Sequence, residues 1–365
     1  METRARTAEE TWAAIRGLLP RAGVTRVADV TWLDHIGIPV FQAVRPNALT
    51  LSVSQGKGTT PAAARVSAAM EALEVWHAEH FPPTGVHARV SDVQRSLTYE
   101  IGGLRSAPRS CLSGDTVLEW APARTLDEDP RETLLPAALF RLDALVAREW
   151  RPPLFTVSSN GLASGTTYDE AVTHALYEVV ERDALAASAR AGNRTRVAPD
   201  SVTGTPRLLL DRLATAGMNV LVEHCPSPVG TPCFAARLRS EDLPVEFIGS
   251  GAHRDPGRAL TRALTEAAQS RLSAIAGTRE DLTKAIYSGR PGSAGEPWDD
   301  AGNGVDFRCF RPVPPGAAGP EWLGLSRAVA AVYGSTPVVV DLRREEFDVP
   351  VVRVVCPGTS CPDDY

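Results

Sequence analysis

Long apolar runs are missing from this sequence of 365 residues. No stretch of about 18 consecutive apolar residues occurs, which argues against a membrane-spanning helix. The opening residues, METRARTAEETWAAIRGLL, are charged and helical in pattern, without the apolar centre that a signal peptide needs. We therefore expect a cytoplasmic protein that makes no membrane contact.

Basic runs and closely spaced cysteine pairs are missing too. The net charge is -6 and no basic run exceeds a few residues, so nucleic acid is not expected as a partner. None of the six cysteines belongs to a C-x-x-C pair, and no histidine cluster lies near them. We expect reduced thiols rather than a disulfide framework or a cysteine metal site.

The common nucleotide-binding signatures are also absent. GKGTT at 56–60 lacks the spacing of a P-loop, and SNGLASG at 159–165 is not a dinucleotide fingerprint. The set of motifs that defines protein kinases is missing as well. Any nucleotide site must therefore be built from other elements.

What the sequence does contain is one theme repeated three times: a strand, a glycine-rich turn and an alanine-rich helix. The first helix is predicted to start at the capping pair Thr60–Pro61 and to end near His80. The second follows a strand within 155–183, and the third begins after a capping Asp255 and ends near Gly277. Thr167 and Glu170 have the spacing of a capping box.

The remaining pattern predicts further strands and helices around this theme. A helix is expected over 8–19, two strands over 36–54, and two more strands near the end of the chain. The composition of 290–322 is typical of a long loop (an excursion from the body) or a linker. We expect a single α/β body in which mixed sheets carry the packed helices. Residues 1–50 would form an N-terminal helix and strands for dimer or partner contact, and 51–365 the catalytic body.

Several glutamates share faces of the first two predicted helices. Glu74 lies about 60° from Glu71 on the helical wheel, and Glu181 lies within about 20° of Glu170. Glu178 stands one turn before Glu181 among small and apolar neighbours. Carboxylates that are partly buried in this way need a cation.

Two interpretations of these acids remain open. They can be solvated glutamates on surface helices, as most glutamates are. Alternatively, each acidic face follows a glycine-rich turn into a helix N-terminus, where backbone N–H groups favour phosphate. Oxygen ligands without histidine or cysteine suit Mg²⁺ better than zinc or iron, so the second interpretation is a site for Mg²⁺ and nucleotide.

Four segments in this order, covering most of the chain, resemble the YcaO family: SQGKGTTPAAARVSAAMEALEVWHAE, SSNGLASGTTYDEAVTHALYEVVERDA, ALTRALTEAAQSRL and VVVDLRREEFDVPVVRVVCPG. The resemblance implies a YcaO-like ATP-binding fold and an enzyme that uses ATP and Mg²⁺ to activate a peptide-backbone amide. Its substrate would be a ribosomally made precursor peptide. The stretch GVTRVADVTWLDHIGIPVFQAVRPN is similar to the subgroup that is found beside TfuA-type proteins and forms thioamides.

The resemblance also implies roles for individual residues. The implied metal ligands are Glu71, Glu74, Glu170, Glu178 and Glu181. The implied ATP contacts are Lys57, Ser67, Glu71, Thr166, Glu170, Arg182 and Gln269. The implied catalytic residues are Glu74, Glu181 and Arg271.

Three of these assignments have alternatives. Gln269 and Arg271 point about 200° apart on a helix, so both contact one ligand only if the helix crosses the site or ends there. Arg271 can instead be a cation favoured by the helix dipole. Lys57 can be a surface lysine. Thr166 departs from the asparagine that relatives often carry, so direct amide coordination of metal is lost there.

The nucleophile that adds to the activated amide decides the product. An outside sulfur source gives a thioamide, which we rank first because the chain ends in CPGTSCPDDY rather than a P-x-P-x-P tail and offers no clasp domain. The alternatives are a stand-alone azoline- or macroamidine-forming cyclodehydratase, a nucleotide-binding partner subunit without turnover, and a metal hydrolase. A precursor peptide, a TfuA-like or peptide-clasping protein and a second copy of the chain are the expected partners.

Overall fold

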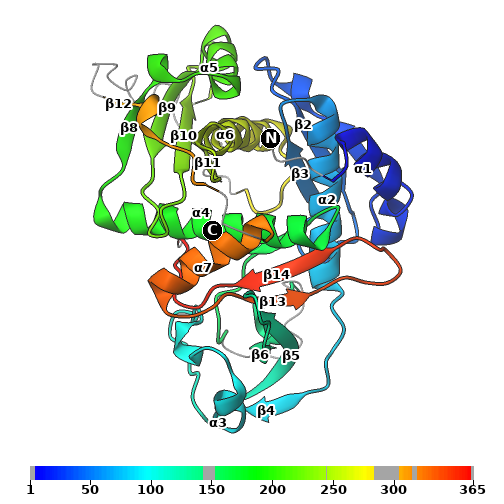
Figure 1. The fold of residues 1–365 in the computed structure, drawn as a ribbon. Coiled ribbons are helices and arrows are strands. Elements are labelled where there is room, and N and C mark those ends of the chain that lie inside the picture. Colours follow the sequence, from blue (N-terminus) through cyan, green and yellow to red (C-terminus); the bar gives the residue numbers. More distant parts are fainter. Residues whose placement is uncertain (1–4, 143–152, 244, 283–303, 315–318, 363–365) are drawn as a thin grey trace.

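The computed structural model describes residues 5–142, 153–243, 245–282, 304–314 and 319–362, arranged as helices packed on three sheets (Figure 1). The first sheet is antiparallel and contains β1 (Arg26–Asp29), β2 (Val40–Val44) and β3 (Val53–Lys57). Helix α1 (Ala8–Ile15) packs on α2 (Pro61–Glu79), which in turn covers β2 and β3.

The second sheet has six strands and lies at the bottom of Figure 1. Its order is β4-β5-β13-β14-β7, and β6 pairs with β5. Every pairing that the structure describes in it is antiparallel. The strands are β4 (His87–Arg89), β5 (Val117–Thr125), β6 (Glu132–Pro136), β7 (Leu162–Ser164), β13 (Val338–Asp341) and β14 (Val351–Val355).

The third sheet has five strands in the order β11-β10-β9-β8-β12. Strand β12 runs parallel to β8, whereas β8 to β11 form an antiparallel meander. These strands are β8 (Thr195–Ala198), β9 (Asn219–His224), β10 (Cys233–Arg239), β11 (Phe247–Ala252) and β12 (Val305–Asp306). The helices α3 (Val90–Val93) and α5 (Thr205–Thr215) lie at the bottom and top of Figure 1, and α7 (Glu321–Tyr333) packs on α4.

Each of the three long helices joins two sheets. Helix α2 packs on β2 and β3 and also contacts β7; α4 (Tyr168–Ala191) packs on β7 and β14 and also contacts β11. Helix α6 (Pro256–Ala276) packs on β10 and β11 and also contacts β3. Each helix therefore covers one sheet and contacts the next, which closes a ring of three helix-on-sheet units around the centre of the molecule.

Glycines in the strands allow these helices to approach closely. A Cβ atom on Gly56 of β3 would lie 2.0 Å from the backbone nitrogen of Ala68 in α2. A Cβ atom on Gly249 of β11 would lie 2.1 Å from the backbone nitrogen of Ala267 in α6. Both distances are impossible for real atoms, so only glycine opposite alanine fits at these contacts.

The structure confirms most of the predicted elements. Helices α2 and α6 begin after the caps Thr60 and Asp255, whose side chains accept from backbone N–H groups of the first turn. The helix predicted over 8–19 is shorter, because it ends at Ile15 and a 3-10 turn follows over Leu19–Ala22. Thr167 caps α4, but the Glu170 carboxylate accepts from Thr166 and not from the cap residue, so the capping box is half formed.

The N-terminal segment is part of the main body. Strands β1 and β2 pair in one sheet with β3, and Ile15 and Leu19 share an apolar core with Leu73 of α2. The division proposed after residue 50 therefore falls inside a sheet, and a dimer or partner contact through 1–50 stays a prediction. Much of 290–322 lies outside the described residues. Within the part described, no helix is both long enough and apolar enough to cross a bilayer.

The close contact at Gly249 gives a test of this packing. Replacing Gly249 by alanine should destabilise the protein by about 1–3 kcal/mol, because the added methyl group forces β11 and α6 apart. Urea unfolding measures the change. Gly17→Ala is the matched control, since a Cβ atom there meets nothing within 4 Å. Equal stability of the two variants would contradict the packing argument.

Candidate active site

Glutamates of α2 and α4 meet where the two helices pass β7. The Glu74 carboxylate accepts from the backbone N–H of Ser164 at 2.8 Å and from the Ser164 hydroxyl at 2.5 Å. Ser164 ends β7, directly before the glycine turn that leads into α4. This contact fixes the acidic face of α2 beside the start of α4.

Three carboxyls of this region have raised pKa values. Burial, together with the charges of Glu71 and Glu178, raises the pKa of Glu74 to about 8 against the hydrogen bonds from Ser164. Burial likewise raises the pKa of Glu71 and of Glu178 to about 7. All three side chains keep some contact with solvent. We refer to Glu71, Glu74 and Glu178 as the acid cluster.

Glu181 and Glu170 lie on the same helix but are held by protein donors. Glu181 is 2% exposed and accepts from the Ser250 hydroxyl at 2.6 Å and from the Ala252 backbone N–H at 3.0 Å. Glu170 accepts from the N–H of Thr166 at 2.9 Å and of Ala5 at 2.7 Å. Glu181 therefore joins α4 to β11, and Glu170 closes the turn before α4.

Cations from three elements surround the acid cluster on its α6 side. Lys57 of β3 forms an ion pair with Glu266 of α6, and Arg182 of α4 lies 4.0 Å from Glu266 and 3.3 Å from Glu181. Arg262 lies 4.0 Å from Glu181. Burial opposes ionisation of Glu266, but Lys57 and Arg182 outweigh it, so its pKa is lowered.

The sequence pattern did not single out Glu266, although this residue lies within the third motif, ALTRALTEAAQSRL. The signal was its position four residues after Arg262, which places both side chains on one face of α6. Gln269 follows one turn later on the same side as Glu266, and Ser67 stands one turn before Glu71 on α2. Predicted residues of the first two motifs, Glu74, Glu178 and Arg182 among them, thus lie in one region with Glu266 of α6. The ATP contacts of Ser67 and Gln269 stay predictions.

Arg271 lies on another side of α6. Its guanidinium is 1% exposed and donates to Asp34 at 2.7 Å, to the Ser240 hydroxyl at 2.7 Å and to Asp242 at 2.8 Å. It lies five residues after Glu266, about 140° away around the helix. Arg271 therefore connects the N-terminal segment to α6, and its predicted contact with nucleotide stays a prediction.

Asp183, which follows Arg182, is buried and holds the C-terminal segment. Its carboxylate accepts from the Ser360 backbone N–H at 2.7 Å and from the hydroxyl of Tyr333. Arg190 donates to the Ser360 hydroxyl at 2.9 Å. Residues after β14 are thereby fixed along α4.

The chemistry of the acid cluster fits Mg²⁺ in the company of phosphate. Within the described ranges no three His, Cys, Asp or Glu side chains are close enough to bind a metal ion by themselves. Mg²⁺ does not need such a set, because it usually takes one or two carboxylates together with waters and phosphate oxygens. The mutual repulsion of Glu71, Glu74 and Glu178 is what a divalent cation would relieve.

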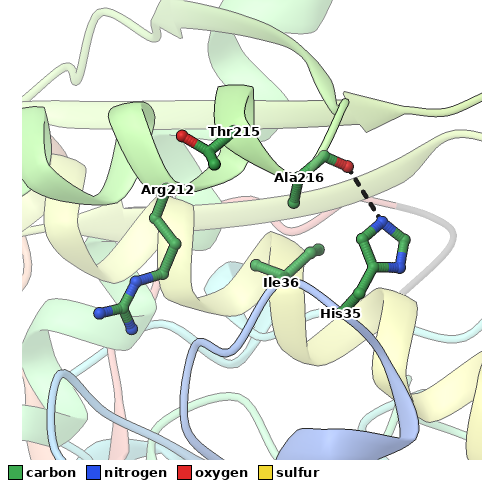
Figure 2. Close-up of a pocket in the computed structure, with 5 residues that line it drawn as sticks. All are labelled: His35, Ile36, Arg212, Thr215 and Ala216. Carbon is green, nitrogen blue, oxygen red and sulfur yellow. Dashed lines mark hydrogen bonds between the residues drawn. The ribbon is translucent and has the colours of Figure 1, made fainter.

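The hollow drawn in Figure 2 lies elsewhere. It is lined by His35, Ile36, Arg212, Thr215 and Ala216, and His35 Nε2 lies 3.0 Å from the carbonyl oxygen of Ala216. A second hollow beside it includes Asp34, Asp242 and Arg271. Neither contains a member of the acid cluster.

Clustered glutamates, flanking cations and three convergent helices fit a site for nucleotide and Mg²⁺. Residues 55–360 match the family described as YcaO cyclodehydratase, ATP- and Mg²⁺-binding. The chain belongs to the YcaO family. This membership confirms the resemblance noted in the sequence, the YcaO-like fold, and ATP and Mg²⁺ as the predicted cofactors.

Similar proteins agree with this assignment. An uncharacterized protein of Mycobacterium tuberculosis is 42% identical over 96% of this chain and 81% of its own length. An uncharacterized protein in the tfuA 3' region of Rhizobium leguminosarum bv. trifolii is 38% identical over 97% of this chain and 88% of its own length. The structure of YcaO from Methanopyrus kandleri, bound with AMPPCP and Mg²⁺, has a TM-score of 0.74 at 26% identity and covers 98% of this chain and 92% of that one.

The acid cluster predicts an unusual pH dependence. Without divalent cations, the free energy of unfolding should fall as pH rises from about 5 to about 8, because the folded protein retains protons that the unfolded chain releases near 4.5. Urea unfolding in EDTA at several pH values measures this. Glu71→Gln should flatten the slope, whereas a stability that rises over this pH range would contradict the raised pKa values.

The surroundings of Arg271 predict a structural role. Arg271→Met should cost about 3–5 kcal/mol of stability, because it leaves the buried Asp34 carboxylate unpaired. Affinity for AMPPCP with Mg²⁺, measured by calorimetry, should stay unchanged. Arg308→Met, which breaks only the exposed pair with Asp306, is the control. Loss of nucleotide affinity with intact stability would instead support the nucleotide contact predicted for Arg271.

Proposed function

We propose that this protein uses ATP and Mg²⁺ to phosphorylate the oxygen of a peptide-backbone amide and installs a thioamide in a ribosomally made precursor peptide. The observation that carries the proposal is the acid cluster on α2 and α4, flanked by Lys57 and Arg182. Membership of an ATP- and Mg²⁺-binding cyclodehydratase family supports it.

The acidic and the basic residues of the site have different proposed roles. Glu71, Glu74 and Glu178 would hold Mg²⁺, because their carboxylates repel one another when no cation lies between them. Lys57, Arg182 and Arg262 lie beside Glu266 and Glu181 and would neutralise phosphate oxygens. Bound ATP supplies the phosphoryl group that turns the amide oxygen into a leaving group. Catalysis then rests on positioning and charge stabilisation.

The proposed reaction balances with hydrosulfide as the outside sulfur source. Sulfur forms a bond to the amide carbon, and the carbonyl π electrons move to oxygen. That oxygen bonds to the γ-phosphorus, while the bond from this phosphorus to the bridging oxygen breaks and its electrons leave with ADP. The C–O bond then breaks, phosphate departs with the amide oxygen, and loss of the sulfur proton gives C=S.

A thioamide product is favoured over an azoline or amidine by one comparison. The Rhizobium relative lies in the tfuA 3' region, and the sequence at 23–47 is similar to the subgroup associated with TfuA-type proteins. A TfuA-like protein is accordingly the partner that we propose. A stand-alone azoline- or macroamidine-forming cyclodehydratase is the alternative product assignment.

A nucleotide-binding subunit without turnover is the alternative of another class. The observation that favours it is Thr166, whose hydroxyl and N–H both engage Glu170. In this arrangement, one predicted metal ligand serves to close a turn.

The reaction is tested with purified protein, ATP, Mg²⁺, sulfide, a candidate precursor peptide and a TfuA-like protein encoded beside the gene. Mass spectrometry should show exchange of one oxygen for one sulfur in the peptide, with equimolar ADP. Glu178→Gln should reduce the rate by about 10²-fold or more, since it removes a metal-binding charge.

Two results would contradict parts of the proposal. Loss of one water from the peptide would indicate an azoline or amidine and exclude thioamide formation. Nucleotide binding without ADP release, equal in the native protein and in Glu181→Ala, would indicate the subunit without turnover.

A further inference from the structure

Arg353 of β14 is a buried cation on the face of the six-stranded sheet that carries the Glu74–Ser164 contact. Val351 pairs with Ser164 across β14 and β7, and Arg353 pairs with Leu162. Paired residues point to the same face, and so do residues two apart in one strand. Arg353 therefore lies on the Ser164 face, about 7 Å along the strand from Val351.

This guanidinium is enclosed, and two of its three nitrogens have no hydrogen-bond partner among the described residues. Arg353 is 5% exposed, and its Nε and Nη1 atoms are buried without a hydrogen-bond partner. The other buried arginines behave differently, because Arg45 is ion-paired with Glu79 and Arg271 with Asp34. Burial lowers the pKa of Arg353 to about 10, which the Glu178 carboxylate opposes.

Arg353 stands apart from the other cations of the site. Lys57, Arg182 and Arg262 lie toward α6, each within 4.0 Å of a carboxylate of Glu266 or Glu181. The titratable neighbours of Arg353 are instead the carboxyl of Glu178 and the neutral thiol of Cys361 in the C-terminal segment. It thus approaches Glu178 from the sheet.

A buried cation whose N–H donors lack hydrogen-bond partners is costly in the resting protein. This free-energy cost is removed when a negative charge forms beside the guanidinium. An interaction that is made only in the transition state accelerates a reaction. If the carboxylates of Glu71, Glu74 and Glu178 bind Mg²⁺, their negative charge no longer stabilises the positive charge of Arg353.

Negative charge develops during the reaction on the oxygen of the attacked amide and on the oxygen that leaves with ADP. Lys57, Arg182 and Arg262 are the cations that would meet the phosphates, which leaves the amide oxygen for Arg353 on the sheet side.

We propose that Arg353 is a further catalytic residue, whose guanidinium N–H groups donate to the amide oxygen while that oxygen becomes negative and bonds to the γ-phosphorus. The inference rests on the phosphoryl-transfer step of the proposed function and not on the identity of the nucleophile. No proton leaves the guanidinium in this role. The N–H donors stabilise the negative charge that forms on the amide oxygen. They stay hydrogen-bonded to this oxygen while it bonds to the γ-phosphorus.

The experiment compares a ground-state analogue with a transition-state analogue, and it needs no peptide. AMPPCP with Mg²⁺ is the analogue of bound ATP. ADP with Mg²⁺ and aluminium fluoride is the analogue of the transition state of phosphoryl transfer, in which an axial water takes the place of the amide oxygen. Arg353→Met should weaken binding of the aluminium fluoride complex by about 10²-fold, as loss of an oxyanion donor does. Its affinity for AMPPCP should stay that of the native protein.

Three controls separate this role from others. Arg353→Lys keeps the charge and should recover part of the lost affinity, and Arg26→Met on the exposed edge of β1 should change neither complex. Thermal unfolding of each variant reports folding. Equal weakening of both analogues would make Arg353 a ground-state phosphate contact, and no weakening would make it structural; either result overturns the proposal.

The outcome is independent of the product assignment. A peptide that gains no sulfur leaves the analogue comparison intact, because the comparison reports only phosphoryl transfer. Failure of the native protein to bind either analogue would contradict the proposed function and this inference together.

Discussion

The close approach of backbone to backbone at the strand glycines is the constraint on which the site depends. At Gly56 and Gly249 the helix lies so near the strand that a single methyl group would collide with the helix backbone. Alanines opposite these glycines complete the contact. Close packing of α2 on β3 and of α6 on β11 fixes where Glu71 and Glu74 of α2 and Glu266 of α6 lie, whereas a larger side chain at either contact would move that helix away from its strand.

The charges of the site follow from this geometry. Burial raises the pKa values of Glu71, Glu74 and Glu178, so ionisation of these carboxyls is disfavoured when no cation is bound. In the proposed function, Mg²⁺ would relieve this repulsion, and its phosphate partners would meet Lys57 and Arg182 at the α6 side. The carboxylates that are not part of the cluster, Glu170 and Glu181, have protein donors and keep their positions without metal.

Local signals in the sequence predicted the three motif helices, because a capping residue and glycine-flanked ends depend on neighbouring residues only. Helical spacing also placed Glu71 with Glu74 on one face. It could not distinguish Glu178, to which no described residue donates, from Glu181, which is bonded to β11, because that difference arises from a strand about 70 residues later. Arg271 shows the same limit, since its partner Asp34 lies 237 residues away in sequence.

The position of β14 has a consequence for how the protein matures during synthesis. In the described sheet, β7 is paired only through β14, a strand near the end of the chain. The strand that leads into α4 therefore has no hydrogen-bonded neighbour until residues 351–355 have left the ribosome. Long-range pairing of this kind closes late. A nascent chain that lacks residues 351–355 would hold β7 without this pairing, so the contact between Ser164 of β7 and Glu74 of α2 would become fixed only after β14 has been made.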